Sequence, residues 1–355
     1  MGSDSAFGEP FYKDKDKAWC IAGPDRVGAG NVRPDGSRKR GAGMRYLSLF
    51  SGIEATTVAW EPLGWEPVAF SEIDPFACEV LSARFPHVPN LGDVTKITEE
   101  QVAALGPIDL VVGGSPCTGL SVSGDREGLA NEQSSLFYEM MRIFEIARRR
   151  NGARWLVWEN VAGALSSNGG ADFREVLGAM AGWKPDVRKW ARGGIVTGPR
   201  GLVEWRVLDA QHFGVPQRRS RVYAVLDTGD WASRQPILFE REGGVRLSAQ
   251  GSGAGSRDTR GVGYRFYENH GNDSRLKEVD VCPTVTAWWG TGGNNVPLVL
   301  HQGDVRRLTV TEAERLMGFP DGWTAIRDSV GHRYRVLGNS MAVPVMRWIG
   351  EGFPV

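Results

Sequence analysis

From Met44 onward, the chain alternates short apolar segments with stretches of helical periodicity, and this alternation constrains the fold more than any other feature of the 355 residues. The strand-like segments are 45–50, 67–70, 108–113, 154–158 and 221–226. The clearest helical stretch is 134–150, in which apolar residues recur at helical spacing. Strands that alternate with helices predict an α/β fold with a mostly parallel sheet covered by helices on both faces.

The same pattern divides the chain into four predicted parts. Residues 1–43 are rich in Gly and charged side chains without sustained periodicity, which predicts a poorly ordered leader that could carry one anchoring patch. Residues 44–227 carry the alternation and are predicted to form the main α/β domain. Residues 228–305, which are crowded with Gly, Ser and Arg over 243–263, are predicted to form a smaller loop-rich insertion, and 306–355 to return to the first domain.

Composition excludes several classes of protein. With 41% hydrophobic and 24% charged residues, the chain is typical of a globular protein. No apolar run approaches the ~18 residues of a membrane helix, and the N-terminus lacks a secretory pattern, so we expect a cytoplasmic protein that does not contact membranes. The four cysteines are widely spaced without a Cys-x-x-Cys pair, so we expect reduced thiols and no required metal.

Charge is balanced over the whole chain, with 42 basic and 42 acidic residues, but unevenly distributed. Residues 44–115 carry ten acidic and three basic side chains, whereas residues 184–221 carry nine basic and three acidic ones. Because clustered Lys and Arg attract phosphate groups, the second segment predicts a face that binds a polyanion. The alternative is an ordinary solvated surface.

Polar residues follow the first two strands of the predicted sheet. The first strand runs through Phe50 and Gly52 into a helix-like segment, and such a turn forms a general nucleotide-cofactor site, although a full G-x-G-x-x-G is absent. The second strand ends at Glu72 and Asp74, where an acid commonly binds the hydroxyl groups of a cofactor ribose. Asp74 also fits a helix cap before Pro75.

Groups capable of catalysis follow the later strands. Cys117 follows the strand 108–113 on a predicted loop, where an exposed thiol could act as a nucleophile, although a lone Cys is more often a small buried residue. Glu159 ends the next apolar strand, where desolvation would raise its pKa and suit it to proton donation, the alternative being an ion-paired helix cap. Arg219 and Arg221 share one face of an extended chain, so both guanidinium groups could point into one cleft.

Taken in this order, the segments resemble the DNA cytosine-C5 methyltransferase family over residues 44–348. The motifs that carry the resemblance are Pro116-Cys117, Glu159-Asn160-Val161, Gln217-x-Arg219-x-Arg221 and Gly338-Asn339-Ser340. The resemblance implies a Rossmann-like S-adenosylmethionine-dependent methyltransferase sheet with helices on both faces, plus a small irregular target-recognition domain. It implies a monomeric enzyme of the restriction-modification type, which transfers a methyl group from S-adenosyl-L-methionine to carbon 5 of a cytosine flipped out of a specific double-stranded DNA sequence.

The resemblance also implies roles for individual residues. Cys117 would attack carbon 6 of the cytosine, Glu159 would contact N3 and the amino edge, Arg221 would contact O2, and Arg219 would organise the pocket. Glu72 would bind the cofactor ribose, Ile73 and Asp93 would lie against the adenine, and the remaining cofactor contacts would come from Phe50, Gly52, Ile53, Val94, Gly114, Pro116, Asn339 and Ser340. DNA contacts would come from Ser121 and Ser123 on a closing loop, and from some of Arg257, Arg260, Arg265, Asn294 and Asn295, because Arg and Asn can read base edges. Cys282 would be structural.

The sequence departs from the family pattern at four places. Ser48 stands where Asp is frequent, and Glu54-Ala55 replaces the usual Gly-Gly. Thr118 follows the cysteine where Gln is usual, and Met341 stands where Val is common. None of these changes removes a group that performs the chemistry.

Three other functions are considered. A transfer-RNA cytosine methyltransferase has the same catalytic plan, but its Cys-Phe-Thr signature is absent here. A non-catalytic DNA-binding regulator has no need for Cys117, Glu159 and Arg221 together. A nicotinamide-dependent dehydrogenase lacks support from a dinucleotide glycine fingerprint. The target sequence and the base that removes the C5 proton remain open.

Overall fold

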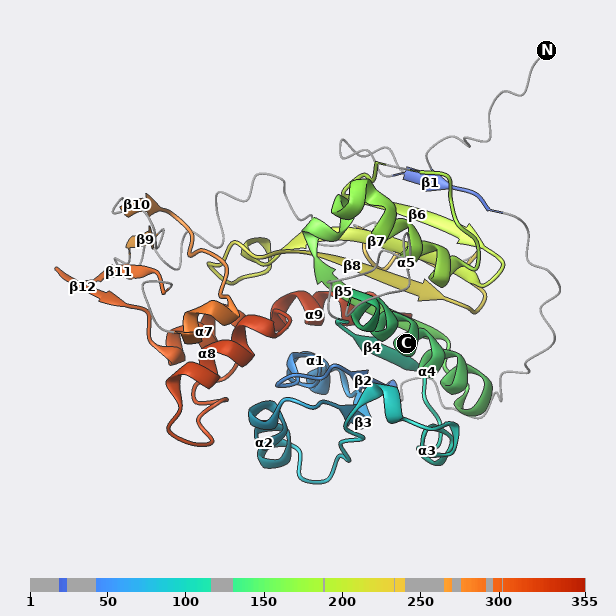
Figure 1. Ribbon diagram of the computed structural model, residues 1–355, viewed down its shortest axis with the longest axis horizontal. Helices are drawn as coiled ribbons and strands as arrows, with labels where there is room; N and C mark the ends of the chain where they lie inside the picture. Colours follow the sequence, from blue (N-terminus) through green and yellow to red (C-terminus); the bar gives the residue numbers. More distant parts are fainter. Residues whose placement is uncertain are drawn as a thin grey trace, which may run out of the picture.

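The computed structural model describes residues 19–23, 43–115, 130–187, 189–232, 234–239, 265–269, 276–291, 296–301 and 303–354. Within these ranges the chain forms an eight-stranded sheet in the order β1-β6-β7-β8-β5-β4-β2-β3 and a four-stranded sheet in the order β10-β9-β11-β12 (Figure 1). The strands of the large sheet are β1 (Trp19–Ile21), β2 (Arg45–Leu49), β3 (Glu66–Ser71), β4 (Leu110–Gly113), β5 (Trp155–Val161), β6 (Gly193–Gly198), β7 (Gly201–Asp209) and β8 (Ser220–Asp227). The helices are α1 (Ala55–Trp60), α2 (Pro75–Arg84), α3 (Glu99–Ala104), α4 (Ala130–Asn151), α5 (Ala171–Ala181), α7 (Val310–Met317), α8 (Val330–Asn339) and α9 (Val343–Gly350).

The large sheet has a parallel part, β3-β2-β4-β5, and an antiparallel part, β5-β8-β7-β6, and β1 adds to its edge parallel to β6. Strands β3, β2, β4 and β5 run parallel to one another, and they are joined by crossovers that contain helices. Strand β8 then pairs antiparallel with β5, and β7 and β6 continue in the same way. The predicted α/β fold is confirmed, and the carboxyl ends of the four parallel strands meet at one edge of the sheet.

Successive residues of the strands point to opposite faces, and each face has its own apolar core. One core joins alternate strand residues such as Tyr46 and Val112 to α1, α2 and α9. The other joins their chain neighbours Leu47 and Val111 to α3, α4 and α5. The sheet is therefore covered by helices on both faces, as the sequence predicts.

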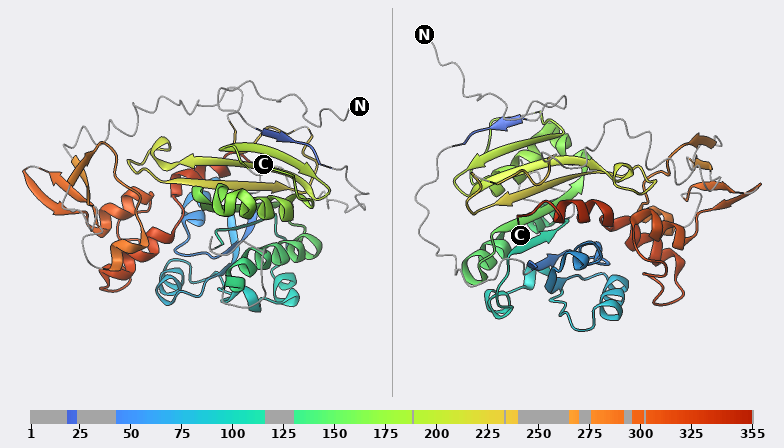
Figure 2. Two further views of the ribbon diagram at one scale, coloured as in Figure 1. Left: turned by 45° about the horizontal axis from the view of Figure 1, so that its top comes forward. Right: turned by 180° about the vertical axis from the view of Figure 1, so that it is seen from behind.

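The small sheet consists of β9 (Arg265–Asn269), β10 (Leu276–Val279), β11 (Leu298–His301) and β12 (Asp304–Arg307), all paired antiparallel. Figure 2 shows it with α7 and α8 to one side of the large sheet, to which α9 returns. These strands fall largely within the predicted insertion 228–305, whose boundaries stay a prediction. A 3-10 turn, η6 (Ala287–Thr291), packs against α8.

All five predicted strands are present, as β2, β3, β4, β5 and β8, and the predicted helix lies within α4. The structure adds β6 and β7, which the sequence did not predict. It also places residues 19–21 of the predicted leader in the sheet, where β1 pairs parallel with β6 and Ile21 packs against the apolar core. This short strand is compatible with the one anchoring patch that was expected in residues 1–43, and the boundary of that segment stays a prediction.

Candidate active site

The turn after β2 lies at the edge where the parallel strands end. Phe50 and Glu54 both adopt the left-handed backbone conformation, with φ of 52° and 61°. Residues other than Gly adopt this conformation only against a steric penalty, so other contacts must hold the turn. Two of these are hydrogen bonds from backbone N–H groups of the turn to the end of β3 and the residue after it: Ser51 N–H donates to the Ser71 carbonyl at 3.1 Å, and Gly52 N–H donates to the Glu72 side chain at Oε2 at 2.7 Å.

The sequence left two roles open for Glu72 and Asp74, ribose binding and helix capping, and the two side chains have different contacts. The carboxylate of Glu72 lies at the sheet edge and also accepts the N–H groups of Ile73 and Asp74, at 2.8 and 2.7 Å. Asp74 caps α2 by accepting two backbone N–H groups at 3.0 Å. The side chain of Ile73 is 69% exposed beside this turn.

Asp93 lies just before the 3-10 turn η2 (Val94–Lys96). Its carboxylate accepts the Thr95 hydroxyl at 2.8 Å and the Thr95 N–H at 3.0 Å, and these hydrogen bonds lower its pKa. Val94 is buried beneath it. Ile53, another predicted cofactor contact, is fully buried, and its carbonyl accepts Trp323 Nε1 at 2.9 Å.

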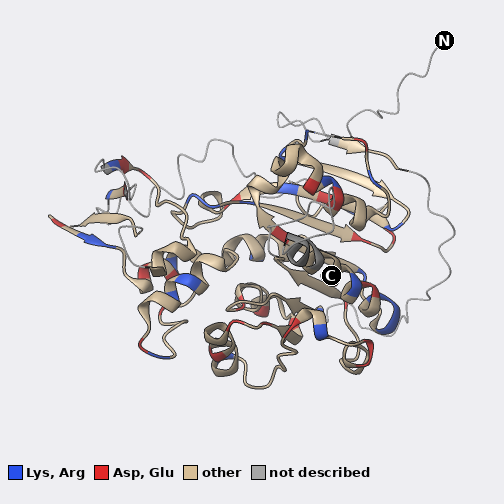
Figure 3. Cartoon of the chain, in the orientation of Figure 1, with Lys and Arg blue, Asp and Glu red and all other residues tan. Residues whose placement is uncertain are grey.

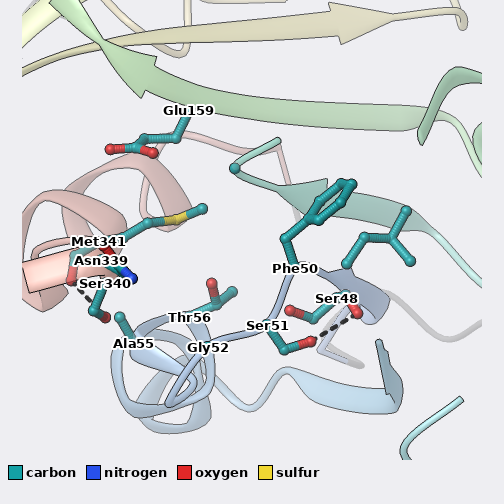
Figure 4. A pocket seen from close by; sticks show the side chains of 12 residues that line it. Ser48, Phe50, Ser51, Gly52, Ala55, Thr56, Glu159, Asn339, Ser340 and Met341 are labelled. Atoms are coloured by element: carbon teal, nitrogen blue, oxygen red, sulfur yellow. Dashed lines mark hydrogen bonds between the residues drawn. The ribbon is translucent and has the colours of Figure 1, made fainter. Parts of the chain in front are cut away.

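A pocket opens between the turn after β2 and the end of α8 (Figure 4). Its lining brings together Phe50, Gly52, Gly114, Glu159, Asn339 and Ser340, all of which the sequence predicted as site residues. The structure adds residues that the sequence did not predict as site residues: Ser48, Leu49, Ser51, Ala55, Thr56 and Met341. Three of them, Ser48, Ala55 and Met341, are departures from the family pattern, and Leu49, Ser51 and Thr56 belong to the strand, turn and helix around Gly52 that the sequence indicated as a cofactor site.

Glu159 and Arg221 meet at the wall of this pocket. Arg221 Nε lies 3.3 Å from Glu159 Oε1, and both side chains are largely buried. Burial raises the pKa of Glu159 above its usual value, and the positive charges of Arg221 and Arg219 oppose this rise. A Cβ on Gly114 would lie 3.0 Å from Glu159 Oε2, so the absence of a side chain there leaves room for the carboxyl.

Arg219 has a different set of contacts. Its guanidinium donates to the carbonyls of Val285 at 2.8 Å, Gly338 at 3.0 Å and Ser340 at 2.6 Å. Arg219 is 2% exposed, and burial lowers its pKa to about 9. The expectation that it organises the pocket fits these bonds, because they hold the segment around Val285 against the end of α8.

Ser115 is hydrogen-bonded to the residues on either side of Glu159. It is the last residue described before the segment that contains the predicted nucleophile, and its carbonyl accepts Asn160 Nδ2 at 3.0 Å while its hydroxyl accepts Trp158 Nε1 at 3.0 Å. These two bonds attach the end of β4 to the end of β5. Pro116, Cys117, Ser121 and Ser123 lie outside the described residues.

Most of the predicted DNA-reading residues also lie outside the described residues, namely Arg257, Arg260, Asn294 and Asn295. Arg265 lies on β9, where it is exposed and forms an ion pair with Glu278 of β10 at 3.5 Å. Cys282 is fully buried, and burial strongly raises the pKa of its thiol, which agrees with a structural role. Backbone bonds join it to Pro216 and Arg218 at 3.0 and 2.9 Å.

The basic face predicted for residues 184–221 stays a prediction. Figure 3 shows Lys and Arg of this segment along β6–β8 and the loop that leads into β8, and acidic residues around α2 and α3. Lys184 and Arg200 are paired with Glu175 and Glu145 at 2.7 and 2.8 Å, so they behave as ordinary surface residues. Within the described part of the chain, no helix is long and apolar enough to span a membrane. The same residues hold no group of three His, Cys, Asp or Glu suited to a metal ion.

Comparison with known proteins identifies the class to which this fold and pocket belong. The model of the C-5 cytosine-specific DNA methylase family matches residues 44–237 and 247–353. The chain is therefore a member of this family of enzymes, as its motifs predict.

Three relatives illustrate this membership. The chain is 29% identical to the DNA N-6-adenine-methyltransferase of Escherichia phage P1, over 86% of the chain and 60% of that protein. It is 29% identical to the Type II methyltransferase M2.BsuMI of Bacillus subtilis, over 87% of the chain and 75% of that protein. It is 26% identical to the Type II methyltransferase M.HhaI of Haemophilus parahaemolyticus, over 88% of the chain and 94% of that protein.

The fold is shared with solved structures. The crystal structure of the S. pombe Dnmt2 methyltransferase superposes with a TM-score of 0.58 at 18% identity, over 86% of this chain and 96% of that one. A putative DNA modification methyltransferase encoded within an E. coli prophage gives a TM-score of 0.54 at 18% identity, over 87% and 98%. Both comparisons agree with the predicted Rossmann-like methyltransferase sheet.

Proposed function

We propose that the chain transfers a methyl group from S-adenosyl-L-methionine to carbon 5 of a cytosine that is flipped out of double-stranded DNA in one short sequence context. The observation that carries the proposal is the position of Glu159. Its carboxyl lines the same pocket as the turn after β2 and is paired with Arg221 at 3.3 Å. Glu159, which would bind the pyrimidine, and the turn after β2, which would bind the cofactor, thus open onto one space.

The residues around the turn fit S-adenosylmethionine. The Glu72 carboxylate at the sheet edge suits the ribose hydroxyls, and the exposed side chain of Ile73 suits the face of an adenine. Phe50, Gly52 and Ser340 would enclose the rest of the cofactor. When bound, this cofactor supplies an electrophilic methyl group, and all the other chemistry falls to side chains of the protein.

The reaction explains why these side chains are needed. Carbon 5 of cytosine is too electron-poor to attack a methyl sulfonium. Addition of the Cys117 thiolate to carbon 6 moves electron density toward N3 and O2 and makes carbon 5 nucleophilic. A proton held by Glu159 at N3, and the Arg221 guanidinium at O2, would stabilise the charge that develops. After methylation, loss of the C5 proton and elimination of the thiol restore the aromatic ring.

A stacked base cannot enter such a pocket. The target nucleotide must leave the duplex, which costs a few kcal/mol and requires contacts elsewhere on the DNA. Residues 228–305, including Arg257, Arg260, Arg265, Asn294 and Asn295, would provide sequence recognition, and Ser121 and Ser123 would close over the DNA.

The pair Glu159–Arg221 favours cytosine over adenine as the target. Adenine has no ring carbonyl that could accept the Arg221 guanidinium, whereas cytosine presents O2 beside N3. The name of the phage P1 relative specifies adenine, but the chain spans only 60% of the length of that protein. The family match and the pocket therefore support cytosine as the target.

The test is expression in a host without DNA methylation, followed by bisulfite sequencing. The wild type and Cys20→Ala, a control thiol in β1, should protect cytosines in one short context, and Cys117→Ala should protect none. Equal protection with Cys117→Ala would reject this thiol as the nucleophile. The appearance of N6-methyladenine without protected cytosine would reject the proposed target.

A further inference from the structure

Glu54 is a carboxylic acid in the turn after β2 that the reaction above does not use. It is 1% exposed. Its Oε2 accepts the Thr57 N–H at 3.1 Å and the Thr57 hydroxyl at 2.5 Å, and its Oε1 accepts the hydroxyl of Ser48. The carboxylate therefore caps α1 and joins the helix to the end of β2.

The backbone at Glu54 explains why these contacts matter. Its φ of 61° and ψ of 56° lie in the left-handed region, which Gly adopts freely and Glu does not. The family usually has Gly at this position, so the side chain adds a steric penalty that its hydrogen bonds must offset. We conclude that the buried carboxyl is part of what defines the shape of the turn.

Ser48 links this carboxyl to the pocket. Its hydroxyl contacts Glu54, and the same residue lines the pocket together with Ala55 and Thr56, which directly follow Glu54. An ionised carboxylate only accepts hydrogen bonds, so the Ser48 hydroxyl must donate to it and presents its lone pairs elsewhere. A protonated Glu54 could donate to Ser48 and reverse this bond.

The charge of Glu54 distinguishes the two forms of the cofactor. S-adenosylmethionine carries a sulfonium, an ammonium and a carboxylate, for a net charge of +1. The product, S-adenosylhomocysteine, lacks the sulfonium charge and is neutral overall. A negative charge buried next to the pocket interacts with this difference more strongly than it would in water.

We propose that Glu54 is a positioning residue of the methyl-donor pocket, and that its negative charge makes the pocket prefer the charged donor over the uncharged product. The inference rests on the proposed function, because it takes the pocket to be the S-adenosylmethionine site. It gives a physical role to the combination of Ser48 and Glu54, which replaces the family's frequent Asp and Gly.

The surroundings make this charge responsive to pH. Burial raises the pKa of Glu54 to about 7, the hydrogen bonds from Ser48 and Thr57 oppose the rise, and the nearby Glu72 adds to it. Among the described residues, Tyr46 also interacts with Glu54, its hydroxyl bonds to Thr57 at 2.8 Å, and Glu61 acts in turn on Tyr46. A bound cation favours the ionised form of Glu54, so donor binding near pH 7 should release protons.

Calorimetry in two buffers of different ionisation enthalpy measures this release directly. At pH 7, binding of S-adenosylmethionine should release up to about half a proton per site more than binding of S-adenosylhomocysteine. The ratio of the product Kd to the donor Kd should rise about three- to tenfold between pH 6 and pH 8. Both ligands carry the same amino group, so its own titration cancels in the comparison.

Three variants distinguish the effect of the Glu54 charge from the effect of its side chain on the shape of the turn. Glu54→Gln keeps the shape and should abolish both the extra proton release and the pH dependence of the ratio. Glu54→Gly alone should lose the preference for the donor, and Ser48→Asp/Glu54→Gly should recover it by returning a carboxylate to the strand. Glu61→Gln, an exposed acid that follows α1, is the control and should behave as the wild type.

The outcomes separate this inference from the proposed function. If the wild type does not bind S-adenosylmethionine, the proposed function fails. If the wild type binds S-adenosylmethionine and methylates DNA, and yet shows the same proton release and the same ratio of product Kd to donor Kd as Glu54→Gln, only the inference is overturned. If Glu54→Gln does not fold, the test rests on the wild type alone. The inference is then rejected if the wild type shows neither the extra proton release nor a pH-dependent ratio of product Kd to donor Kd.

Discussion

The side chains of Glu159 and Arg221 meet across the antiparallel strands β5 and β8, with Arg221 Nε 3.3 Å from Glu159 Oε1. The register pairs Glu159 with Tyr223 and Arg221 with Val161, so the two charged residues are diagonal neighbours. Each charge offsets part of the desolvation of the other, and removal of one partner would leave a buried charge uncompensated. This pair therefore controls how readily Glu159 holds a proton.

Substitution of Arg221 should change both the rate and its pH dependence. Arg221→Met removes a positive charge that lowers the pKa of Glu159, so that pKa should rise further. The single-turnover rate of methyl transfer should fall about 100-fold or more, because a group that stabilises developing charge is lost. If the protonated form of Glu159 is the active one, the pH above which the methyl-transfer rate of this variant declines should be higher than in the wild type. Arg221→Lys should leave that pH unchanged.

Rapid-quench measurements with radiolabelled cofactor over pH 6 to 10 would test this, with Arg218→Ala as an exposed control of the same charge. The proposed role of Glu159 would be contradicted if the rate of Arg221→Met declined at the same pH as that of the wild type, or at a lower pH.

Substitution of Arg219 should lower the free energy of unfolding more than substitution of the adjacent Arg218. Arg219→Met removes three hydrogen bonds and leaves the carbonyls of Val285, Gly338 and Ser340 without this partner. The expected loss of unfolding free energy is about 3–5 kcal/mol, measured by urea denaturation. Arg219→Lys should lose less, and Arg218→Ala, at an exposed position, less than about 0.5 kcal/mol. Equal effects of Arg219→Met and Arg218→Ala would rule out the described role.

These two arginines also show what the sequence could and could not predict. The strands β2, β3, β4, β5 and β8 could be predicted because each is an apolar run long enough to be recognised. Glu72 and Glu159 could be predicted as site residues because they stand at the ends of two of these strands. The spacing of Arg219 and Arg221 suggested one shared cleft. It could not show that Arg219 binds carbonyls 66, 119 and 121 residues away, because such pairings depend on how distant segments pack.

The strands that the sequence missed have physical reasons. Strand β6 contains three Gly among six residues, and β7 carries Glu204 and Arg206 among its apolar residues, so neither reads as a continuous apolar run. Strand β1 has only three residues and is defined by its pairing with β6. The departures at Ser48 and Glu54 were visible in the sequence, but only the structure shows that the two side chains contact each other.

The bonds to Ser115 should affect formation of the covalent intermediate. Trp158→Phe keeps an aromatic side chain, although a smaller one, and removes the Nε1 donor, and Asn160→Ala removes the donor to the Ser115 carbonyl. Each lost bond contributes about 0.5–1.5 kcal/mol, so adduct formation should slow by up to about tenfold if the bond holds the Cys117 segment in place. The rate at which DNA containing 5-fluorocytosine is trapped would measure this. Val161→Ala, exposed at the same strand end, is the control, and equal trapping rates in all three variants would refute the prediction.

Glu54 should make the free protein less stable as the pH rises. Its pKa is about 7 in the folded state and 4.5 in the reference state, so the folded protein binds the proton more tightly. The stabilisation from this group is present in full below pH 4.5 and is lost as the pH rises through 7. Relative to Glu54→Gln, the unfolding free energy of the wild type should fall by roughly 3 kcal/mol between pH 4.5 and pH 8.

Urea denaturation of both proteins at several pH values would measure this difference, because the other titrating groups are common to both and cancel. Parallel pH profiles would show that Glu54 does not titrate in this range. Saturation with S-adenosylmethionine should reduce the decline, since a bound cation favours the ionised carboxylate, whereas S-adenosylhomocysteine should reduce it less. A destabilising charge that the donor compensates would explain why the turn retains a buried Glu where Gly would relieve its backbone.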